Sequence, residues 1–374
     1  MTTTICRMRE GARATSHSAP RRSFLMAVPA VASVMCVSPW AGATALRGHE
    51  RVGVILPASE RFPGARHAWL EGFESELRRQ GVAPTMAIEH ASTPSQLRGA
   101  VNALLQQEVR LVAAWSDGNE LLEHQHALAD HGVRLVLSDF GAKALRKSAE
   151  AHVVRCGPEL WRHAFAAGHD LARRGARSML VVAGYYESGF DLVHATLRGF
   201  RAGGGQRHEI VVTGTPDLSA GDAGWLRANT TVQGAAPDVV MSLHSAHEIE
   251  GFHTFWVSRA NRWKGRALAA LVGDSDAPRL APSESSAVSL YQPRMIDVGT
   301  TRSTVSTDSM AAQAGRSAAQ VASGLPRPTW ATLRREASSS WAPLDGSGWH
   351  HPALANGLHG PGAGAAGWLS PYGA

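Results

Sequence analysis

Short apolar, β-branched runs alternate with longer amphipathic segments along most of this chain, starting at residue 51. Residues 51–57 (Arg-Val-Gly-Val-Ile-Leu-Pro) form an apolar run that is typical of a buried strand. In residues 64–80, Trp69, Phe73 and Leu77 recur at the spacing of one helix face. Strands that alternate with helices indicate parallel sheets covered by helices on both faces. We therefore predict an α/β fold.

The alternation falls into two series, which predicts two lobes. The first series contains strands at 51–57, 84–89, 109–115 and 133–138, and helices at 64–80, 94–107 and 118–131. The second begins near Cys156 and contains helices at 158–174, 188–202, near 220–228 and 246–262, and strands at 177–183, 208–213, 237–243 and 266–272. A strand at 286–292 and an alanine-rich helix at 306–323 follow. Roughly 330 residues from residue 46 onward exceed what one core usually serves, in agreement with two lobes.

An export signal precedes the first series. Arg21 and Arg22 are followed by Ser-Phe-Leu, and the moderately apolar segment 24–40 has the length of a signal-peptide core. The small residues at 41–45 (Ala-Gly-Ala-Thr-Ala) offer two cleavage sites of the A-x-A type. We predict that residues 1–45 are a twin-arginine signal peptide, cleaved near 43–45, and that the mature protein is periplasmic.

Two alternatives concern the same apolar segment. It could remain in the membrane as an anchor, but about 20 predominantly apolar residues are needed to span a bilayer, and Pro29 and Pro39 interrupt the run. Cys36 suggests a lipoprotein, yet the Ser-Val-Met before it lacks the small residue expected beside a lipidated cysteine. Cleavage without stable membrane insertion is therefore the prediction.

Charge and cysteine content restrict the function classes. Removing residues 1–45 takes away five arginines and Glu10, so the net charge falls from +6 to +2, with 32 basic and 30 acidic residues left. No run of basic residues supports a nucleic-acid surface. Of the three cysteines only Cys156 survives cleavage, so no intrachain disulfide forms and stability must come from packed cores.

The composition changes beyond Leu325. Pro326 and Pro328 are followed by four tryptophans, at 330, 341, 349 and 368, and residues 343–374 are rich in Gly, Pro and Ala. The tail has no useful periodicity, so we predict that it is mostly disordered. Trp330 and Trp341 are expected to dock on a lobe before order is lost.

Candidate ligand-binding residues follow from the strand positions, because ligands of open parallel sheets bind beyond the carboxyl ends of the strands. In the first series these are Ser59, Phe62, Trp115, Ser116, Asp117, Ser138 and Asp139; in the second they are Tyr185, Tyr186, His244 and Asp274. Several have a structural alternative. Ser116, Asp117 and Ser138 are good helix caps, and Trp115 and the tyrosines could simply cover apolar surface. The histidines at 244, 247 and 253 are too loosely spaced for a metal site, and no cofactor is expected.

Several short stretches, taken in order, resemble one family. Residues 52–57 followed by Gly64 and Gly72-Phe73-Glu74 are similar to its first strand, ligand loop and helix. Further similarities lie at 153–156 (Val-Val-Arg-Cys), at Gly189-Phe190 with the helix that follows and the glycines at 203–205, at 237–240 (Pro-Asp-Val-Val) and at 289–293 (Ser-Leu-Tyr-Gln-Pro). With the export signal, the chain resembles the type I periplasmic ligand-binding proteins, specifically the branched-chain amino-acid-binding branch of the ABC-transporter substrate-binding proteins, over residues 51–325.

The resemblance implies two Rossmann-like lobes, joined by a three-segment hinge, that close on a ligand in the manner of a Venus flytrap. Lobe 1 would span 46–156 with 284–325 returning to it, lobe 2 would span 157–283, and 326–374 would be the tryptophan-containing C-terminal segment and tail. The implied partners are a small-molecule ligand and an inner-membrane ABC permease or a sensor. We expect a monomer.

Two departures from the family affect the expected ligand. Where the family holds a ligand carboxylate after the strand at 109–115, this chain has Ser116 but also Asp117, which would repel an anion. Gly184 and Tyr185 replace the acidic residues that usually bind the ligand's ammonium group. A neutral or cationic, partly aromatic ligand fits better, with Trp115 and Tyr186 facing each other across the cleft and contributing stacking or cation–π contacts.

Three function classes remain. A periplasmic solute receptor is the main prediction. An enzyme is not expected, because the chain lacks a Gly-x-Ser-x-Gly elbow, a phosphate-binding loop and a His-Glu-x-x-His motif. The alternative is a regulatory or assembly module on the same fold that has lost ligand binding and uses its tryptophan-rich C-terminal segment as the contact.

Overall fold

The structure is a computed structural model that describes residues 46, 50–58, 64–147, 149–185, 191–213, 237–244, 248, 251–252, 267–271, 288–296, 310–336 and 342–344. All of them belong to one compact unit, Ser38–Ala374. Arg21 and Arg22 of the export signal lie outside the described residues, as do the helix expected near 220–228, most of the helix expected at 246–262, and Trp341. None of the described helices is long and apolar enough to cross a membrane.

The first sheet has five parallel strands in the order β2-β1-β3-β4-β5. They are β1 (Arg51–Leu56), β2 (Thr85–His90), β3 (Leu111–Trp115), β4 (Arg134–Ser138) and β5 (Val153–Arg155). Side chains of the central strands alternate between two cores. Leu111 and Ala113 pack in one core, whereas Val112 and Ala114 pack in the other. A strand buried on both faces must be apolar throughout, which explains the continuous apolar runs.

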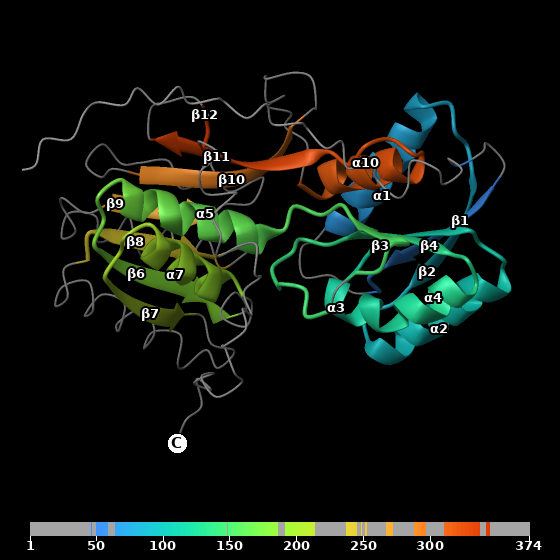
Figure 1. The fold of residues 1–374 in the computed structure, drawn as a ribbon, viewed down its shortest axis with the longest axis horizontal. Coiled ribbons are helices and arrows are strands. Elements are labelled where there is room, and N and C mark those ends of the chain that lie inside the picture. Colours follow the sequence, from blue (N-terminus) through green and yellow to red (C-terminus); the bar gives the residue numbers. More distant parts are fainter. Residues whose placement is uncertain are drawn as a thin grey trace, which may run out of the picture. The chain divides into compact units, whose positions relative to one another are not determined.

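Helices cover both faces of this sheet (Figure 1). On one face lie α1 (Ala65–Arg79) and α10 (Met310–Ala322); on the other lie α2 (Pro94–Gln106), α3 (Gly118–Leu121), the 3₁₀ turn η2 (Leu122–His124) and α4 (Gln125–Asp130). The single helix predicted at 118–131 is therefore interrupted. His124 leaves the helical region of backbone space at φ −102° and ψ 2°, and the two pieces still bury Leu121 and Leu128.

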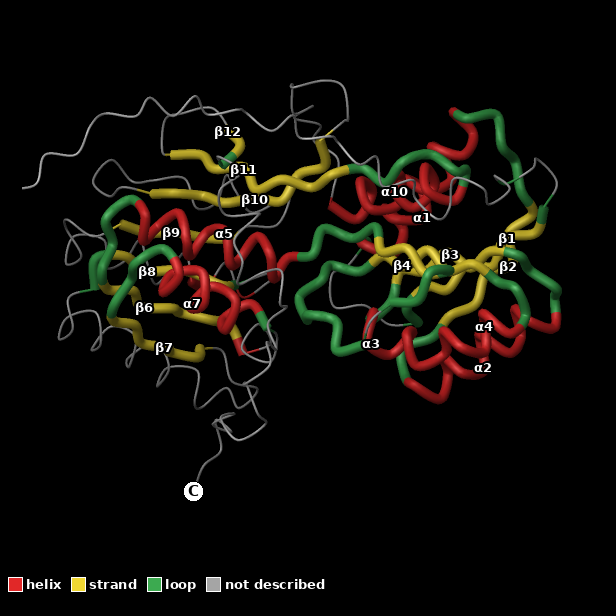
Figure 2. The backbone as a smooth tube through the Cα atoms, in the orientation of Figure 1, coloured by secondary structure: helices red, strands yellow, loops and turns green. Residues whose placement is uncertain are grey.

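The second sheet has the order β12-β11-β10-β9-β8-β6-β7 (Figure 2). Its parallel strands are β6 (Ser178–Gly184), β7 (Arg207–Thr213), β8 (Val239–Leu243), β9 (Ala267–Leu271) and β10 (Val288–Ile296). β11 (Thr329–Glu336) and β12 (Ala342–Pro343) are antiparallel to their neighbours. Helices α5 (Leu160–Arg173) and α7 (Leu192–Ala202) pack together against this sheet.

β11 is a strand that the sequence analysis did not predict. It pairs with β10 along its whole length, from Thr329 opposite Ile296 to Glu336 opposite Ser289. Trp330 is buried, so its predicted docking is confirmed. A part-buried cluster also ties both strands to α5: the Tyr291 hydroxyl donates to Asp170 Oδ2 at 2.8 Å, and Arg334 Nη1 donates to Asp170 Oδ1 at 2.9 Å.

Each helix pair packs closely because glycines face backbone across the contact. In α5–α7, a side chain at Gly199 would place Cβ 1.9 Å from the Phe165 carbonyl oxygen. In α1–α10, a side chain at Gly315 would place Cβ 2.1 Å from the Trp69 carbonyl oxygen. Real Cβ atoms never approach so closely, so each pair depends on the missing side chain.

The strand pairing refines the predicted division of the chain. The predicted boundary returned all of 284–325 to lobe 1, but β10 hydrogen-bonds to β9 in the second sheet. In the described part of that range, α10 is the element that packs against α1 of the first sheet. The chain passes between the sheets at 156–159, between β5 and α5, and at 323–328, between α10 and β11. A third passage, from β10 to α10, lies at 297–309, outside the described residues.

Glu159 links two of these passages. Its backbone is left-handed, with φ 52°, which is uncommon for a residue with a side chain. Its carboxylate lies 3.3 Å from Arg155 Nη1, 3.2 Å from Arg162 Nε and 3.4 Å from Arg327 Nη2. Burial alone would lower the pKa of the Arg155 guanidinium, but the charges of Asp139 and Glu159 raise it. The ionic cluster therefore joins the passage at 156–159 to the one at 323–328.

Candidate functional site

Five predicted site residues lie at the carboxyl edge of the first sheet. Trp115 and Ser138 end the neighbouring strands β3 and β4 in register, and the Ser116 amide donates to the Ser138 carbonyl oxygen at 3.1 Å. Asp117 and Asp139 continue the two strands. The strand register thus brings Ser116, Asp117, Ser138 and Asp139 to one edge of the sheet, and their role in ligand binding stays a prediction.

Asp117 has two internal partners. Its Oδ1 accepts from the Asn119 amide at 2.9 Å, so Asp117 caps α3 as the structural alternative expected. Its Oδ2 accepts from Lys143 Nζ, also at 2.9 Å. The ammonium offsets the negative charge that was expected to repel an anionic ligand. Lys143 did not figure in the sequence analysis, because it comes from the loop between β4 and β5.

Asp139 lies deeper and binds an arginine. Arg155 Nη2 lies 3.0 Å from Oδ1 and 3.2 Å from Oδ2, and the Gly118 amide also donates to Oδ2 at 3.2 Å. Burial raises the pKa of the Asp139 carboxyl, and the Arg155 charge opposes that shift. Asp139 thus holds β4, β5 and the start of α3 together. Arg155 stood in the motif at 153–156 but was not singled out as a site residue.

Trp115 is a core residue in this structure. Only 5% of it is exposed. Its ring packs edge-on against Phe140, with centroids 4.7 Å apart, and lies 6.5 Å from that of Trp69. These contacts favour packing, the alternative role considered for Trp115.

The Ser138 hydroxyl differs from the groups around it. Ser138 is fully buried, caps none of the described helices, and its Oγ has no hydrogen-bond partner among the described residues. The indole Nε1 of Trp69, which packs against Trp115, is also buried without a described partner. Buried polar atoms are usually paired, and an exception calls for an explanation such as a bound molecule.

His244 follows β8 at the corresponding edge of the second sheet and is fully engaged. The Thr213 hydroxyl donates to the Ala183 carbonyl oxygen, so it accepts from His244 Nε2 at 2.9 Å. Nδ1 then accepts from the Ser242 hydroxyl at 2.9 Å. Burial lowers the pKa of His244 to about 3, so the ring is neutral at physiological pH. Within the described ranges, no group of three or more metal-binding side chains forms.

The remaining predicted residues divide into two groups. Tyr185 directly follows β6 and is half-buried. Ser59, Phe62, Tyr186 and Asp274 lie outside the described residues, so the proposed facing of Trp115 and Tyr186 stays a prediction.

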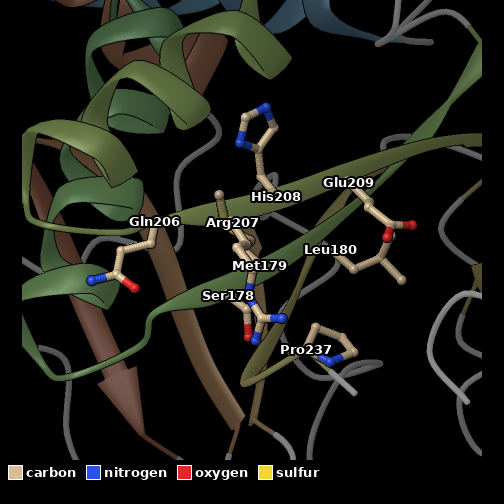
Figure 3. Close-up of a pocket in the computed structure, with 8 residues that line it drawn as sticks. All are labelled: Ser178, Met179, Leu180, Gln206, Arg207, His208, Glu209 and Pro237. Carbon is tan, nitrogen blue, oxygen red and sulfur yellow. The ribbon is translucent and has the colours of Figure 1, made fainter. Parts of the chain in front are cut away.

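A surface pocket of about 380 Å³ lies at the opposite, amino-terminal end of the second sheet (Figure 3). It is lined by the first residues of β6 and β7 and by two neighbours: Ser178, Met179, Leu180, Gln206, Arg207, His208, Glu209 and Pro237. Arg207 and His208 project to opposite sides of β7 (Figure 3). None of the predicted site residues lines it, and parallel sheets bind ligands at the other end of their strands.

Two α/β sheets, linked by several chain passages and bearing a polar cluster at a carboxyl edge, define a two-sheet α/β architecture. No family model and no curated protein matches the sequence. Solved structures do match. A solute-binding protein of an ABC transporter from R. palustris, in complex with benzoate, is 16% identical with a TM-score of 0.57, over 79% of this chain and 96% of that one.

Two further structures agree. An ABC transporter substrate-binding protein from Sphaerobacter thermophilus is 18% identical with a TM-score of 0.58, over 73% of this chain and 79% of that one. A leucine-binding protein from Thermotoga maritima is 13% identical with a TM-score of 0.53, over 79% and 98%. The chain has the type I periplasmic binding protein fold, as the sequence motifs predicted.

Proposed function

We propose that this protein is a periplasmic solute-binding receptor that captures a small molecule between two lobes and delivers it to an ABC-type permease or a sensor. The proposal rests on the fully buried Ser138 hydroxyl at the carboxyl edge of the first sheet, which has no hydrogen-bond partner among the described residues. Such a hydroxyl can bind a polar group of a ligand at the place where parallel sheets bind ligands. The fold supports this function, and solved proteins that share it bind small molecules.

The lobes would be built around the two sheets and would move about the passages at 156–159 and 323–328. In this proposal α10 belongs to lobe 1, whereas β10 and β11 belong to lobe 2. The protein would act as a monomer without enzymatic activity. The twin-arginine signal would bring it to the periplasm.

The Lys143–Asp117 pair bears on the charge of the ligand. A cationic ligand group would compete with Lys143 for Asp117, whereas an anionic group would bind Lys143 beside Ser138. Solute-binding proteins of the same fold are in complex with benzoate and with 4-hydroxybenzoate. Benzoate and benzylamine are therefore a suitable matched pair, because they share the ring and differ in the sign of the charge.

Native mass spectrometry of the protein purified from its own periplasm tests the function directly. We expect a small molecule that co-purifies and that raises the melting temperature when it is added back, because a ligand that binds only the folded state stabilises it. Thermal shifts with benzoate and benzylamine would then give the preferred charge. The absence of any co-purifying or stabilising molecule would contradict a transport receptor.

A regulatory or assembly module without ligand binding is the second candidate. It is favoured by the internal pairing of Asp117, Asp139 and His244, because these polar groups already have partners within the chain. This module would retain a protein partner after cross-linking in the periplasm and would show no ligand-dependent stabilisation.

A further inference from the structure

The loop between β4 and β5 contains a segment that bonds to elements of both sheets. Residues 140–147, which we name the strap, follow the first-sheet strand β4 after Asp139. From Ala142 to Leu145 its side chains contact two sides in alternation. One side is built from α5 and α7, the other from α3 and its neighbour η2.

The first side of the strap is bound to the helices of the second sheet. The Asp191 amide, at the start of α7, donates to the Ala142 carbonyl oxygen at 3.0 Å. Asp191 Oδ2 accepts from the Ala144 amide at 2.8 Å. The Ala144 methyl group is buried in the second-sheet core with Trp161 and Leu192. Backbone, carboxylate and apolar contacts therefore all hold Ala144 to this side.

The opposite side of the strap is bound to α3 of the first sheet. Asn119 makes two bonds: its Nδ2 donates to the Ala144 carbonyl oxygen at 3.2 Å, and its Oδ1 accepts from the Arg146 amide at 2.8 Å. Lys143 pairs with Asp117 at 2.9 Å. Leu145 packs on the first-sheet core. Asn119 and Asp191 therefore act in the same way from opposite sides. Each has a polar side chain that hydrogen-bonds to the backbone of the strap.

We propose that the strap is a restraint between the lobes, anchored by Asn119 on one side and Asp191 on the other, and that separation of the lobes requires release of the Asn119 anchor. The Asn119 side is the weaker one. Its ion pair is part-exposed, at 40% for Lys143 and 29% for Asp117, and exposed pairs contribute little. The Asp191 side includes the buried Ala144, which keeps the strap with α7.

This restraint depends on the fold and not on the identity of a ligand, so it can fail or hold independently of the proposed transport function. It also gives Asp117 a second role. A ligand group that displaced Lys143 from Asp117 would weaken the same side of the strap that must open.

Distances between spin labels on the two lobes test the strap. Labels are attached to Ser95→Cys on α2 and Arg173→Cys on α5, both exposed positions. Cys6→Ala and Cys36→Ala remove two other thiols, and Cys156 stays unlabelled because it is buried and burial raises the pKa of its thiol to about 12. Pulsed electron–electron double resonance is measured on the purified protein without added ligand.

We expect Asn119→Ala to shift the distance distribution and broaden it, because both bonds from α3 to the strap are lost. Asp191→Ala should do the same from the other side, whereas Asp191→Asn keeps an acceptor for the Ala144 amide and should match the parent protein. Asp238→Ala is the control. Asp238 Oδ2 also accepts from two backbone amides, at 2.8 Å each, but within the second sheet alone.

Asn119→Ala decides the outcome, because it alters a half-buried side chain and leaves the core intact. Circular dichroism confirms that each variant is folded. If the distance distribution of Asn119→Ala coincides with that of the parent protein, the proposal that the strap restrains the lobes is wrong. An equal shift in Asp238→Ala overturns it as well, because the change would then reflect general loosening rather than release of a bridge.

Discussion

The indole Nε1 of Trp330 donates a 3.3 Å hydrogen bond to the carbonyl oxygen of Cys156, 174 residues earlier in the chain. Cys156 begins the passage from β5 to α5, and Trp330 lies in β11 just after the passage from α10. Both residues are buried. The bond therefore joins two of the connections between the sheets at the place where the lobes would pivot.

Removing that bond should destabilise the protein measurably. Trp330→Phe keeps most of the apolar area but leaves the Cys156 carbonyl without its donor, and we expect a loss of about 1–3 kcal/mol in the free energy of unfolding. Trp330→Ala should lose about 3–5 kcal/mol because a cavity is added. Urea denaturation measures both. Equal stability of Trp330→Phe and the parent would show that the hydrogen bond is energetically irrelevant.

Trp115 should behave as a packing residue. Trp115→Ala is expected to lower the free energy of unfolding by about 3–5 kcal/mol without any ligand, because the ring is buried against Trp69 and Phe140. Trp115→Phe retains much of the packing and serves as the binding probe. Calorimetry measures the affinity of Trp115→Phe for the co-purifying ligand. A tenfold weaker affinity than that of the parent protein would show that Trp115 contacts the ligand.

Ser138 should show the opposite behaviour. Its hydroxyl has no described partner, so Ser138→Ala removes a desolvated polar group and should leave stability unchanged or raise it by up to about 1 kcal/mol. Ligand affinity should fall about tenfold, the equivalent of one hydrogen bond of about 1.4 kcal/mol. Ser317→Ala on α10 changes another fully buried serine and should not affect affinity. Thermal unfolding and calorimetry separate the two effects.

Two buried histidines predict an acid-sensitive fold. Burial lowers the pKa of His163 and of His244 from 6.5 to about 3. The unfolded chain therefore binds protons first as the pH falls. The stability contribution of each neutral ring is complete above pH 6.5 and is lost progressively between pH 6.5 and 3.

From pH 7.5 to pH 5 each of these histidines should account for a loss of about 2 kcal/mol. His244→Gln should be less stable at pH 7.5 but should lose about 2 kcal/mol less on acidification. Urea denaturation at the two pH values measures this, with the exposed His131→Gln as control. If His244→Gln and the parent protein lose the same free energy of unfolding between the two pH values, burial does not lower the pKa of His244 as described.

Export should depend on Arg21 and Arg22. On the proposed export route a twin-arginine translocase would recognise this pair, so replacing both by lysine should leave the precursor in the cytoplasm. Cell fractionation and immunoblotting measure the distribution, and Arg9→Lys in the same leader is the matched control. Undiminished periplasmic protein in the double variant would indicate the general secretory route.

The periodicity of the sequence predicted most of the described elements, because buried strands must be apolar and helices must present one apolar face. It also placed Ser116 and Ser138 at one edge, since parallel register brings strand ends together. β11 was missed because Arg334 and Arg335 interrupt its apolar pattern, and the strand depends on its partner β10 for stability. Lys143, Arg155 and Asn119 were missed because their partners come from loops, whose course no periodicity specifies.

The contact between α1 and α10 has a consequence for how the protein acquires its structure. Trp69 and Phe73 on α1 pack against α10, which lies about 240 residues further along the chain, after every parallel strand of the second sheet. A ribosome would therefore expose this apolar face of the first sheet until almost the whole polypeptide had been made. Contacts of such long sequence separation slow folding and favour aggregation of intermediates. Maturation of the protein would then be a post-translational event, in which the last of the described helices completes the core on one face of the first sheet.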